Sequence, residues 1–462
     1  METICAIATA PGGAIGVVRV SGPEAIGKVS ALFRSASGRR LTDCPDRQMM
    51  FGRIVDERGE TVDEVLAVCF RAPHSYTGED SVEISCHGSA YILGKVIDLL
   101  IEQGCRAAQP GEYTKRAFLN GKMDLCQAEA VADIVSARSR AAHRLAVNQM
   151  RGGVSKALND LRHQLLNVAS LLELEIDFSD HEDVEFADRS ELDRLSAETE
   201  NSIARLTASF RVGNAIKNGL PVAIVGETNA GKSTLLNLLV GEERAIVSPV
   251  HGTTRDAVED VVIMDGFSLR LIDTAGIRQT DDEVEAMGIE RTYRKIDAAE
   301  VVLYVVDATA TDAQAGKLSA DIISRCADKQ LIVVVNKIDL LPGSTWQGTL
   351  PQLPADARVV AISAKQEIGI DRLRSAIIEA AGLSELSPTE VIITNARHHQ
   401  ALTEALDAIR RVRSGLSAGL SADLLSEDLR LCNQALGEIV TGGSITTTEV
   451  LGSIFGRFCI GK

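Results

Sequence analysis

The residues with the clearest chemical capacity lie in one short stretch, Gly226-Glu-Thr-Asn-Ala-Gly-Lys-Ser233. Two glycines separated by four residues, followed by lysine and serine, are typical of a loop that holds phosphate groups. The glycines let backbone N–H groups turn inward, Lys232 can pair with the β- and γ-phosphates as a catalytic residue, and the Ser233 hydroxyl can ligate magnesium. The stretch predicts a nucleoside triphosphate site. Its predicted contacts are Asn229, Ala230, Gly231, Lys232, Ser233 and Thr234.

Two further motifs decide which base is bound. Asp339, in Asn336-Lys337-Ile338-Asp339, can accept hydrogen bonds from the ring N–H and the exocyclic amine of guanine together. Adenine does not offer this pair of donors. Ser363-Ala364-Lys365 would supply a backbone N–H to the guanine carbonyl. With Asp273-Thr274-Ala275-Gly276, these motifs predict binding of GTP rather than ATP. The base-side contacts are predicted to be Asn336, Lys337, Asp339, Ser363, Ala364 and Lys365.

The residues around the γ-phosphate indicate an unusual route to hydrolysis. Asp273 would hold magnesium through water, Thr254 would be the second magnesium-side ligand, and the Gly276 N–H would contact the γ-phosphate. Ile277 follows Gly276 and cannot orient the attacking water, so a residue from elsewhere must do so. The next loop offers Asp281, Asp282, Glu283, Glu285 and Glu290. The remaining predicted GTP contacts are Ser248, Pro249, Val250, His251, Gly252, Thr253, Thr254, Asp273, Thr274, Ala275 and Gly276.

Strand ends and helix starts must position these motifs. An apolar run over 222–225 and helical spacing over 233–240 place a strand before the glycine loop and a helix after it. The runs 301–308, 331–339 and 358–365 are nearly continuously apolar, as expected for parallel strands covered on both faces. Asp265-Gly266 predicts a hairpin turn. We therefore expect a doubly wound, Ras-like GTPase domain over 218–383.

The rest of the chain divides into a mixed part and two helical parts. Strand patterns over 16–22, 62–70 and 82–88, with a helix over 90–103, predict a small α+β domain at 1–120. Long helical patterns fill 121–217 and 384–462. The expected fold is thus multidomain α/β and α, with one helical bundle interrupted by the inserted GTPase domain.

Composition limits the location and partners of the protein. The 462-residue chain has a formal net charge of −16 and no apolar run long enough to span a membrane. Its nine cysteines are scattered singly, without zinc spacing, and are expected to be reduced thiols. These features predict a soluble, cytoplasmic protein on which only a local basic patch could bind nucleic acid.

Several longer segments identify a family. APGGAIGVVRVSG, SYTGEDSVEISCHG, PGEYTKRAFLNGKMDLCQAEAVADI, IDFSDHEDVEF, AIVSPVHGTTRD, DTAGIRQTDDEVEAMGIER and the terminal FCIGK all occur in this order. The chain resembles the bacterial tRNA modification GTPases of the MnmE (TrmE) family over essentially its whole length. The resemblance implies an N-terminal folate-binding and dimerising domain, and a helical domain that contains an inserted GTPase.

The resemblance also implies a reaction and its partners. Together with the flavoprotein MnmG (GidA), such an enzyme adds a carboxymethylaminomethyl or aminomethyl group to carbon 5 of the tRNA wobble uridine. A tetrahydrofolate derivative, for which 5-formyl-tetrahydrofolate is an analogue, supplies the one-carbon unit, and GTP hydrolysis drives a conformational cycle. The implied partners are a second copy of the chain, MnmG in a heterotetramer, and tRNA.

Residue roles carry over position by position. In the family, potassium stands where other GTPases use an arginine, and a glutamate that positions water corresponds to Glu285. The potassium ligands map onto Asn229, Ser248, Val250 and Thr253. The folate contacts map onto Arg19, Glu83, Lys122 and Lys462. The sequence departs from the common family pattern at Thr228, His251 and Ser89.

Alternatives remain at four points. A ribosome-assembly GTPase would share the nucleotide motifs without modification chemistry, and the N-terminal domain could be a dimerisation module without a ligand. Cys459 is equally consistent with covalent chemistry and with an inert thiol, because no base stands beside it in the sequence. For His87 a packed histidine is expected rather than a catalytic one.

Overall fold

The computed structural model describes residues 1–177, 189–226, 229–242, 260–272, 285–309, 322–341, 353, 357–383, 390–441, 455–456, 458 and 461. The chain divides into two compact units. The first contains residues 1–136, 146–196 and 407–462, and the second contains residues 137–145 and 197–406. Both units are therefore assembled from segments far apart in the sequence.

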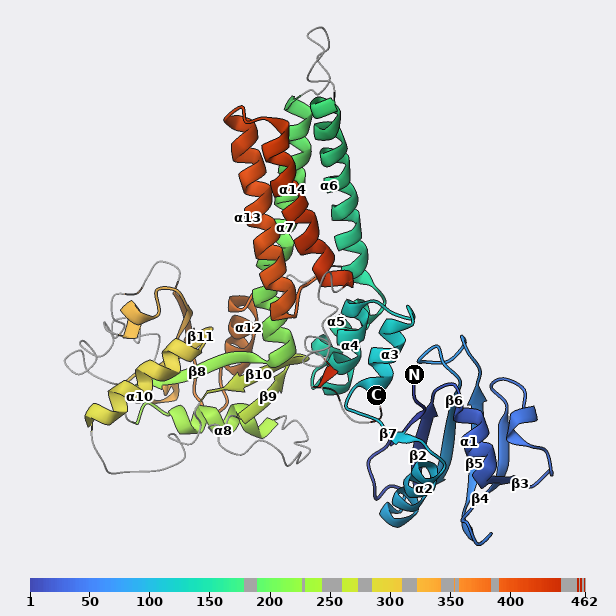
Figure 1. The fold of residues 1–462 in the computed structure, drawn as a ribbon. Helices are drawn as coiled ribbons and strands as arrows, with labels where there is room; N and C mark the ends of the chain where they lie inside the picture. The colour runs from blue at the N-terminus through green and yellow to red at the C-terminus, as the bar shows by residue number, and fades with distance from the viewer. Residues whose placement is uncertain are drawn as a thin grey trace. The chain divides into compact units, whose positions relative to one another are not determined.

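A seven-stranded sheet forms the N-terminal part of the first unit (Figure 1). Its order is β3-β4-β5-β6-β2-β1-β7, and every neighbouring pair is antiparallel except β1 and β7. The strands are β1 (Ile4–Ile7), β2 (Ile15–Ser21), β3 (Phe33–Ser35), β4 (Met49–Val55), β5 (Thr61–Phe70), β6 (Ser81–His87) and β7 (Arg106–Ala107). A 3-10 turn, η1 (Leu41–Asp43), precedes β4.

Two helices cover one face of this sheet. α1 (Ala25–Leu32) and α2 (Ala90–Glu102) bury their apolar residues against alternate strand residues such as Val18, Val20 and Ile84. Because side chains alternate between the faces of a strand, Arg19 and Glu83 belong to the opposite face. The same unit continues with α3 (Glu112–Leu119) and α4 (Leu125–Ser136).

Long helices from both sides of the nucleotide motifs pack together. They are α6 (Gly153–Asp177), α7 (Arg189–Asn218), α13 (Ala396–Ser417) and α14 (Ala422–Thr441). The shorter α5 (Arg140–Met150) precedes α6 in the chain. Arg162 Nε of α6 donates to Asn433 Oδ1 of α14 at 3.0 Å. Arg413 of α13 pairs with Asp193 of α7 at 3.3 Å. These contacts join helices that the nucleotide motifs separate in sequence, so the prediction of an interrupted helical bundle is confirmed.

The second unit is built on a six-stranded sheet of order β13-β12-β11-β8-β10-β9. All neighbours are parallel except β9 and β10, whose hairpin turns at Asp265 and Gly266 with φ of 50° and 82°. Apolar clusters lie on both faces of the sheet, which explains its continuously apolar strands. The strands are β8 (Leu220–Gly226), β9 (Asp260–Met264), β10 (Phe267–Leu271), β11 (Val301–Asp307), β12 (Gln330–Asn336) and β13 (Arg358–Ala361). The helices are α8 (Lys232–Glu242), α10 (Glu285–Ala298) and α12 (Ile370–Ala380), with a 3-10 turn η2 (Ile338–Leu340).

The predicted strands over 16–22, 62–70 and 82–88 agree with β2, β5 and β6 to within one residue at each end. β1, β3 and β4 were not predicted.

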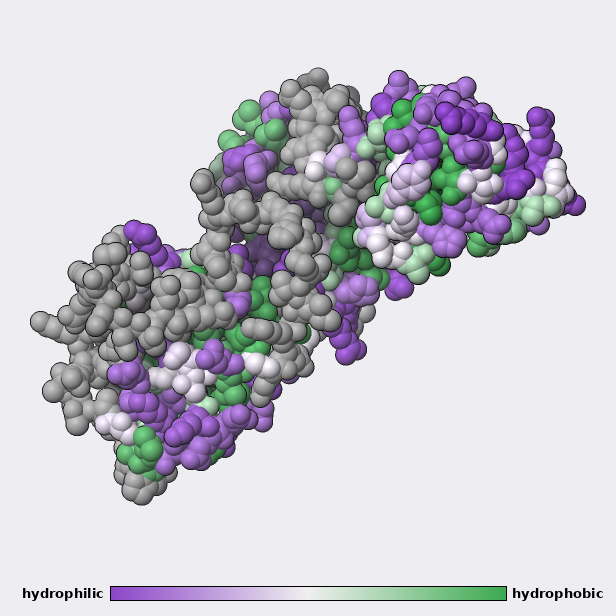
Figure 2. All heavy atoms as spheres, turned by 90° about the horizontal axis from the view of Figure 1, so that it is seen from below, coloured by the Kyte–Doolittle hydropathy of each residue, from purple (hydrophilic) through white to green (hydrophobic). Residues whose placement is uncertain are grey.

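No described helix is long and apolar enough to cross a membrane. In the view of Figure 2, hydrophilic side chains are interspersed with hydrophobic ones over the described surface.

Candidate functional site

The phosphate loop begins where β8 meets the neighbouring strand β11. Gly226 has φ of +144°, and a Cβ at this position would lie 2.2 Å from the Val305 carbonyl oxygen. Only glycine therefore fits. The Lys232 ammonium, at the start of α8, donates to the Gly226 carbonyl at 2.9 Å. The lysine thus lies over the turn in which the phosphates are expected.

Asn336 joins this loop to the base-side loops. Its Nδ2 donates to the Ala230 carbonyl at 2.8 Å, and its Oδ1 accepts from the Ala364 N–H at 3.0 Å. The side chain is 3% exposed, so both bonds are shielded from water. A Cβ at Gly231 would lie 2.2 Å from Asn336 Nδ2, which requires glycine there. The Asn336 amide therefore joins two other predicted nucleotide-binding motifs, the glycine loop and Ser363-Ala364-Lys365, to its own motif.

Lys337 and Asp307 connect the ends of β12 and β11. Lys337 is left-handed, with φ of 68°, and its Nζ lies 2.6 Å from Asp307 Oδ2. Burial alone would raise the pKa of the Asp307 carboxyl, but hydrogen bonds from Lys337 and Thr309 outweigh burial and lower it. The carboxylate is consequently ionised at neutral pH and holds the lysine stem in place. Asp339 follows, half-buried in η2.

The other described residues of the predicted nucleotide site differ in exposure. Asn229, Ser233, Thr234 and Lys365 are exposed, and Ser363 is fully buried. Asn229 adopts φ of 64°, a left-handed conformation that asparagine tolerates. Glu285 is the first residue of α10, and its side chain lies outside the described part of the structure. Further predicted residues lie wholly outside the described ranges: Ser248, Pro249, Val250, His251, Gly252, Thr253, Thr254, Asp273, Thr274, Ala275, Gly276, Cys459 and Lys462.

A second site lies on the face of the N-terminal sheet opposite α1 and α2, where α3 contributes residues. Arg19 Nε donates to Glu83 Oε1 at 2.9 Å, because β2 and β6 place the two residues opposite each other. The Arg19 guanidinium carbon lies 5.8 Å from the ring centroid of Tyr76 and 5.7 Å from that of Tyr113. The structure thus brings two of the four predicted folate contacts together, and places Arg19 near two aromatic rings.

The chain also returns to this site near its last residues. Arg19 Nη1 donates to the Gly461 carbonyl at 3.1 Å. A Cβ at Gly461 would lie 2.5 Å from the Ile7 carbonyl oxygen, so Gly461 itself is tightly packed against the sheet. Lys122 Nζ donates to the Pro73 carbonyl at 3.0 Å, in the loop that also carries Tyr76. The third predicted folate contact is therefore tied to the same loop.

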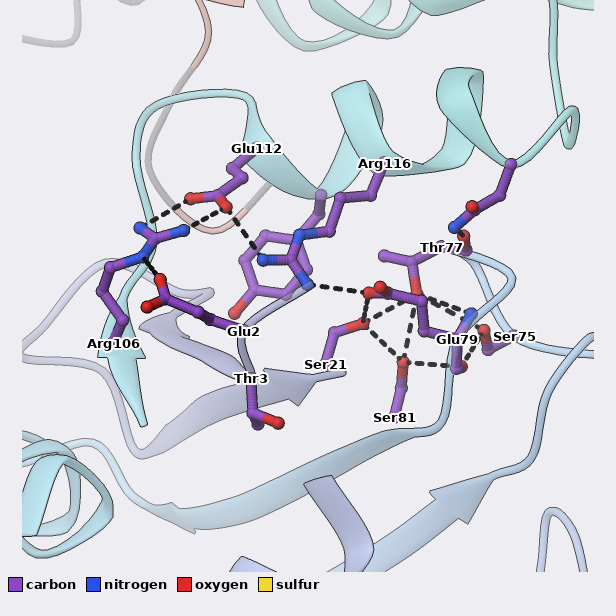
Figure 3. A network of polar contacts seen from close by, with 12 residues as sticks. Glu2, Thr3, Ser21, Ser75, Thr77, Glu79, Ser81, Arg106, Glu112 and Arg116 are labelled. Carbon is purple, nitrogen blue, oxygen red and sulfur yellow. Dashed lines mark hydrogen bonds and ion pairs between the residues drawn. The ribbon is translucent and has the colours of Figure 1, made fainter. Parts of the chain in front are cut away.

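A polar network holds that loop against α3 (Figure 3). Arg116, 3% exposed, donates to Glu79 Oε2 at 2.9 Å and to Glu112 Oε1 at 3.0 Å. Burial would raise the pKa of Glu112, but Arg106, the Gln109 N–H and Arg116 all donate to it and lower the pKa. The carboxylate therefore stays charged in the network.

Sequence reasoning missed the roles of Tyr76, Tyr113 and Asp307. SYTGED supported only the resemblance, and Asp307 is simply the last residue of an apolar strand. The expectation for His87 was wrong, because its side chain is 70% exposed while Nδ1 lies 2.8 Å from the buried Asp63 carboxylate. Strand alternation could have indicated this, since His87 shares the face of Glu83.

In the parallel sheet, strand β8 continues through the glycine loop into helix α8, and Asn336 joins that loop to the base-side motif. This arrangement defines a GTPase fold. The chain matches two family models. One is described as "GTP-binding protein TrmE N-terminus" and matches residues 3–122, and the other is described as "MnmE helical domain" and matches residues 125–459. The chain belongs to the MnmE family.

Curated relatives agree with this assignment. A "tRNA modification GTPase MnmE" of Phocaeicola vulgatus is 54% identical, covering 100% of this chain and 99% of its own. The protein of the same name from Bacteroides thetaiotaomicron is 56% identical with the same coverage. That of Parabacteroides distasonis is 52% identical and is covered completely, as is this chain.

Replacing Asn336 with alanine should destabilise the second unit. The Ala230 carbonyl and the Ala364 N–H would lose their buried partner, at a cost of about 2–3 kcal/mol. The thermal transition of this unit should fall by about 5–10 °C, measured by calorimetry on the full chain. The matched control is Asn218→Ala, because the exposed Asn218 amide donates to Asn214 Oδ1 and not to a nucleotide-binding motif. Equal transitions for both variants would contradict the role of Asn336.

Proposed function

We propose that the protein is a GTPase that modifies carbon 5 of the wobble uridine of certain tRNAs. With the flavoprotein MnmG, it would add a carboxymethylaminomethyl or aminomethyl group, using a one-carbon unit from tetrahydrofolate. The observation that carries this proposal is the Arg19–Glu83 pair, flanked by two tyrosines and reached by Gly461, in a chain that also has a guanine-nucleotide site. The name shared by the relatives supports the tRNA substrate.

In the proposed nucleotide site the chain positions charge rather than forming covalent bonds. Lys232 would neutralise the β- and γ-phosphates, and Asp339 would read guanine. The Ser233 hydroxyl, exposed on the first turn of α8, suits magnesium because a hydroxyl oxygen is a hard ligand. Magnesium held there would supply positive charge beside the phosphates. Thr254 is its proposed second protein ligand, and Glu285 would orient the attacking water.

The proposed folate site uses Arg19, Glu83, Lys122 and Lys462. A guanidinium beside a carboxylate presents donors and an acceptor together, which suits a heterocycle with both amine and carbonyl groups. The test is calorimetric titration of the full chain with 5-formyl-tetrahydrofolate. Saturable binding that weakens in Glu83→Gln is expected, and absence of binding to the unmodified chain would overturn this part of the proposal.

The proposed organisation is a folate-binding and dimerising domain at 1–120, helical segments at 121–217 and 384–462, and a GTPase domain at 218–383. The proposed partners are a second copy of the chain, MnmG and tRNA, in the cytoplasm. A ribosome-assembly GTPase is the competing function. Loss of the wobble modification, with normal ribosome profiles, in cells whose only copy is Glu83→Gln would favour tRNA modification.

GTP hydrolysis should depend on potassium. Asn229, Ser248, Val250 and Thr253 are the proposed ligands, all neutral oxygens that suit a large monovalent cation. Turnover in potassium should exceed that in sodium by roughly tenfold or more, because a cation beside the phosphates stabilises charge that develops in the transition state. Steady-state phosphate release at equal ionic strength measures this ratio.

Asn229→Gly is the informative variant for potassium. Glycine accepts φ of 64° without strain, so the change removes a ligand oxygen and keeps the backbone. The variant should show a similarly low rate in both salts. A potassium preference that survives in Asn229→Gly would exclude this side chain as a ligand.

A further inference from the structure

One aromatic ring of the N-terminal site is both rigidly held and open to a ligand. Tyr113 and Tyr76 both lie within 6 Å of the Arg19 guanidinium carbon. Tyr113 is fully buried and donates its hydroxyl to the Arg19 carbonyl at 2.8 Å. Tyr76 is 39% exposed. Of these two rings, therefore, only Tyr76 offers free surface next to the Arg19–Glu83 pair.

The Tyr76 hydroxyl is anchored to α3. It lies 2.8 Å from Thr114 Oγ1, and Thr114 is fully buried. Burial raises the pKa of the Tyr76 phenol, so the hydroxyl keeps its proton at neutral pH and can share it with Thr114. This bond fixes the tilt of the ring, which a surface tyrosine would otherwise change freely.

The backbone that carries Tyr76 is fixed independently. Asn120 Nδ2 donates to the Thr77 carbonyl at 2.7 Å, and Arg116 holds Glu79 at 2.9 Å. Below the loop, Ser21 Oγ lies 2.7 Å from Thr77 Oγ1, and the Ser81 hydroxyl donates to Ser21 Oγ at 3.1 Å. Figure 3 shows this network between the loop and α3. A loop held on both sides of Tyr76 presents the ring with little loss of entropy on binding.

We propose that Tyr76 is the stacking surface for the bicyclic ring of the folate, and that Thr114 and Arg116 are residues that position it. The inference rests on the folate site proposed above. A flat, nitrogen-rich ring can contact the face of Tyr76 while its edge exchanges hydrogen bonds with Arg19 and Glu83. Stacking and an in-plane donor–acceptor pair together select a heterocycle over an aliphatic ligand.

The test is calorimetric titration of full-length variants with 5-formyl-tetrahydrofolate. Tyr76→Leu should weaken binding about tenfold, the scale of aromatic stacking, whereas Tyr76→Phe keeps the ring and should change affinity by about twofold. Thr114→Val preserves shape but removes the hydroxyl partner, and should cost about threefold. The matched control is Tyr91→Leu, because Tyr91 is 76% exposed on α2, the helix that covers the opposite face.

Two ligand fragments separate stacking from general damage. Tyr76→Leu should weaken binding of 6-methyltetrahydropterin and leave that of p-aminobenzoyl-glutamate unchanged. Equal affinity of Tyr76→Leu and the unmodified chain for 5-formyl-tetrahydrofolate would overturn the inference. So would equal losses in Tyr76→Leu and Tyr76→Phe, or equal losses for both fragments. If the unmodified chain binds no folate, the proposed function fails instead.

Discussion

Asp339→Asn should lower the affinity for GTP by about 10²–10³-fold, while binding of xanthosine triphosphate improves. In the proposed site the carboxylate would accept two hydrogen bonds from guanine, and asparagine would replace one acceptor with a donor that faces the guanine amine. Losing a charged hydrogen bond and gaining a mismatched donor costs roughly 3–4 kcal/mol. Xanthine carries a carbonyl where guanine carries that amine, so the new donor finds an acceptor. Equilibrium titration with both nucleotides measures the change.

The control for Asp339 is Asp371→Asn. Asp371 lies on α12 with a side chain that is 99% exposed, so the same loss of charge occurs away from the base. Its GTP affinity should not change. Unaltered GTP affinity in Asp339→Asn, or no gain for xanthosine triphosphate, would contradict the assignment of Asp339 as the residue that reads the base.

Glu285→Ala should slow GTP hydrolysis by about 10²–10⁴-fold with little change in nucleotide affinity. The residue begins α10, directly after the acidic segment that follows Gly276, and Ile277 cannot orient water. We infer that its carboxylate orients the attacking water once two GTPase domains of a dimer meet across their nucleotides. The loss corresponds to roughly 3–5 kcal/mol of transition-state stabilisation. Single-turnover hydrolysis and GTP affinity, measured side by side, provide the test.

Other acids of the same stretch serve as controls for Glu285. Glu283→Ala and Glu290→Ala remove the same charge within a few residues and should retain turnover within about threefold. If Glu285→Ala hydrolyses GTP at the normal rate, or if its slower rate is explained by weaker binding, the residue is not the one that orients water.

The second unit was predictable from sequence because its signals are local. Each strand from β8 to β13 is a short apolar run, and Asp265-Gly266 carries the residue types that its hairpin requires. The N-terminal sheet was predicted only in part. β1, β3 and β4 were missed because β1 and β3 span only four and three residues, and β4 has glycine in its centre. Pairing with distant strands, rather than local propensity, defines these elements.

The same distinction applies to the sites. The glycine loop and the Asn336 motif are contiguous in sequence, so their types and spacing were sufficient to identify them. The Arg19–Glu83 pair depends on the register between β2 and β6, and the ring of Tyr76 reaches Arg19 only because Arg116 and Thr114 anchor a loop to α3. The periodicity of apolar residues along the sequence does not predict such contacts. A resemblance to a family named the charged residues but not the aromatic ones.

The bond from Arg19 to the Gly461 carbonyl has a consequence for synthesis of the protein. The two residues are 442 positions apart. At roughly 5–20 residues per second, the ribosome needs about 20–90 s to proceed from one to the other. During that interval the nascent N-terminal sheet can fold, and the GTPase strands emerge afterwards, but Arg19 still lacks its carbonyl partner. Premature termination downstream of the GTPase strands would therefore yield a chain that contains every nucleotide motif and an incomplete N-terminal site.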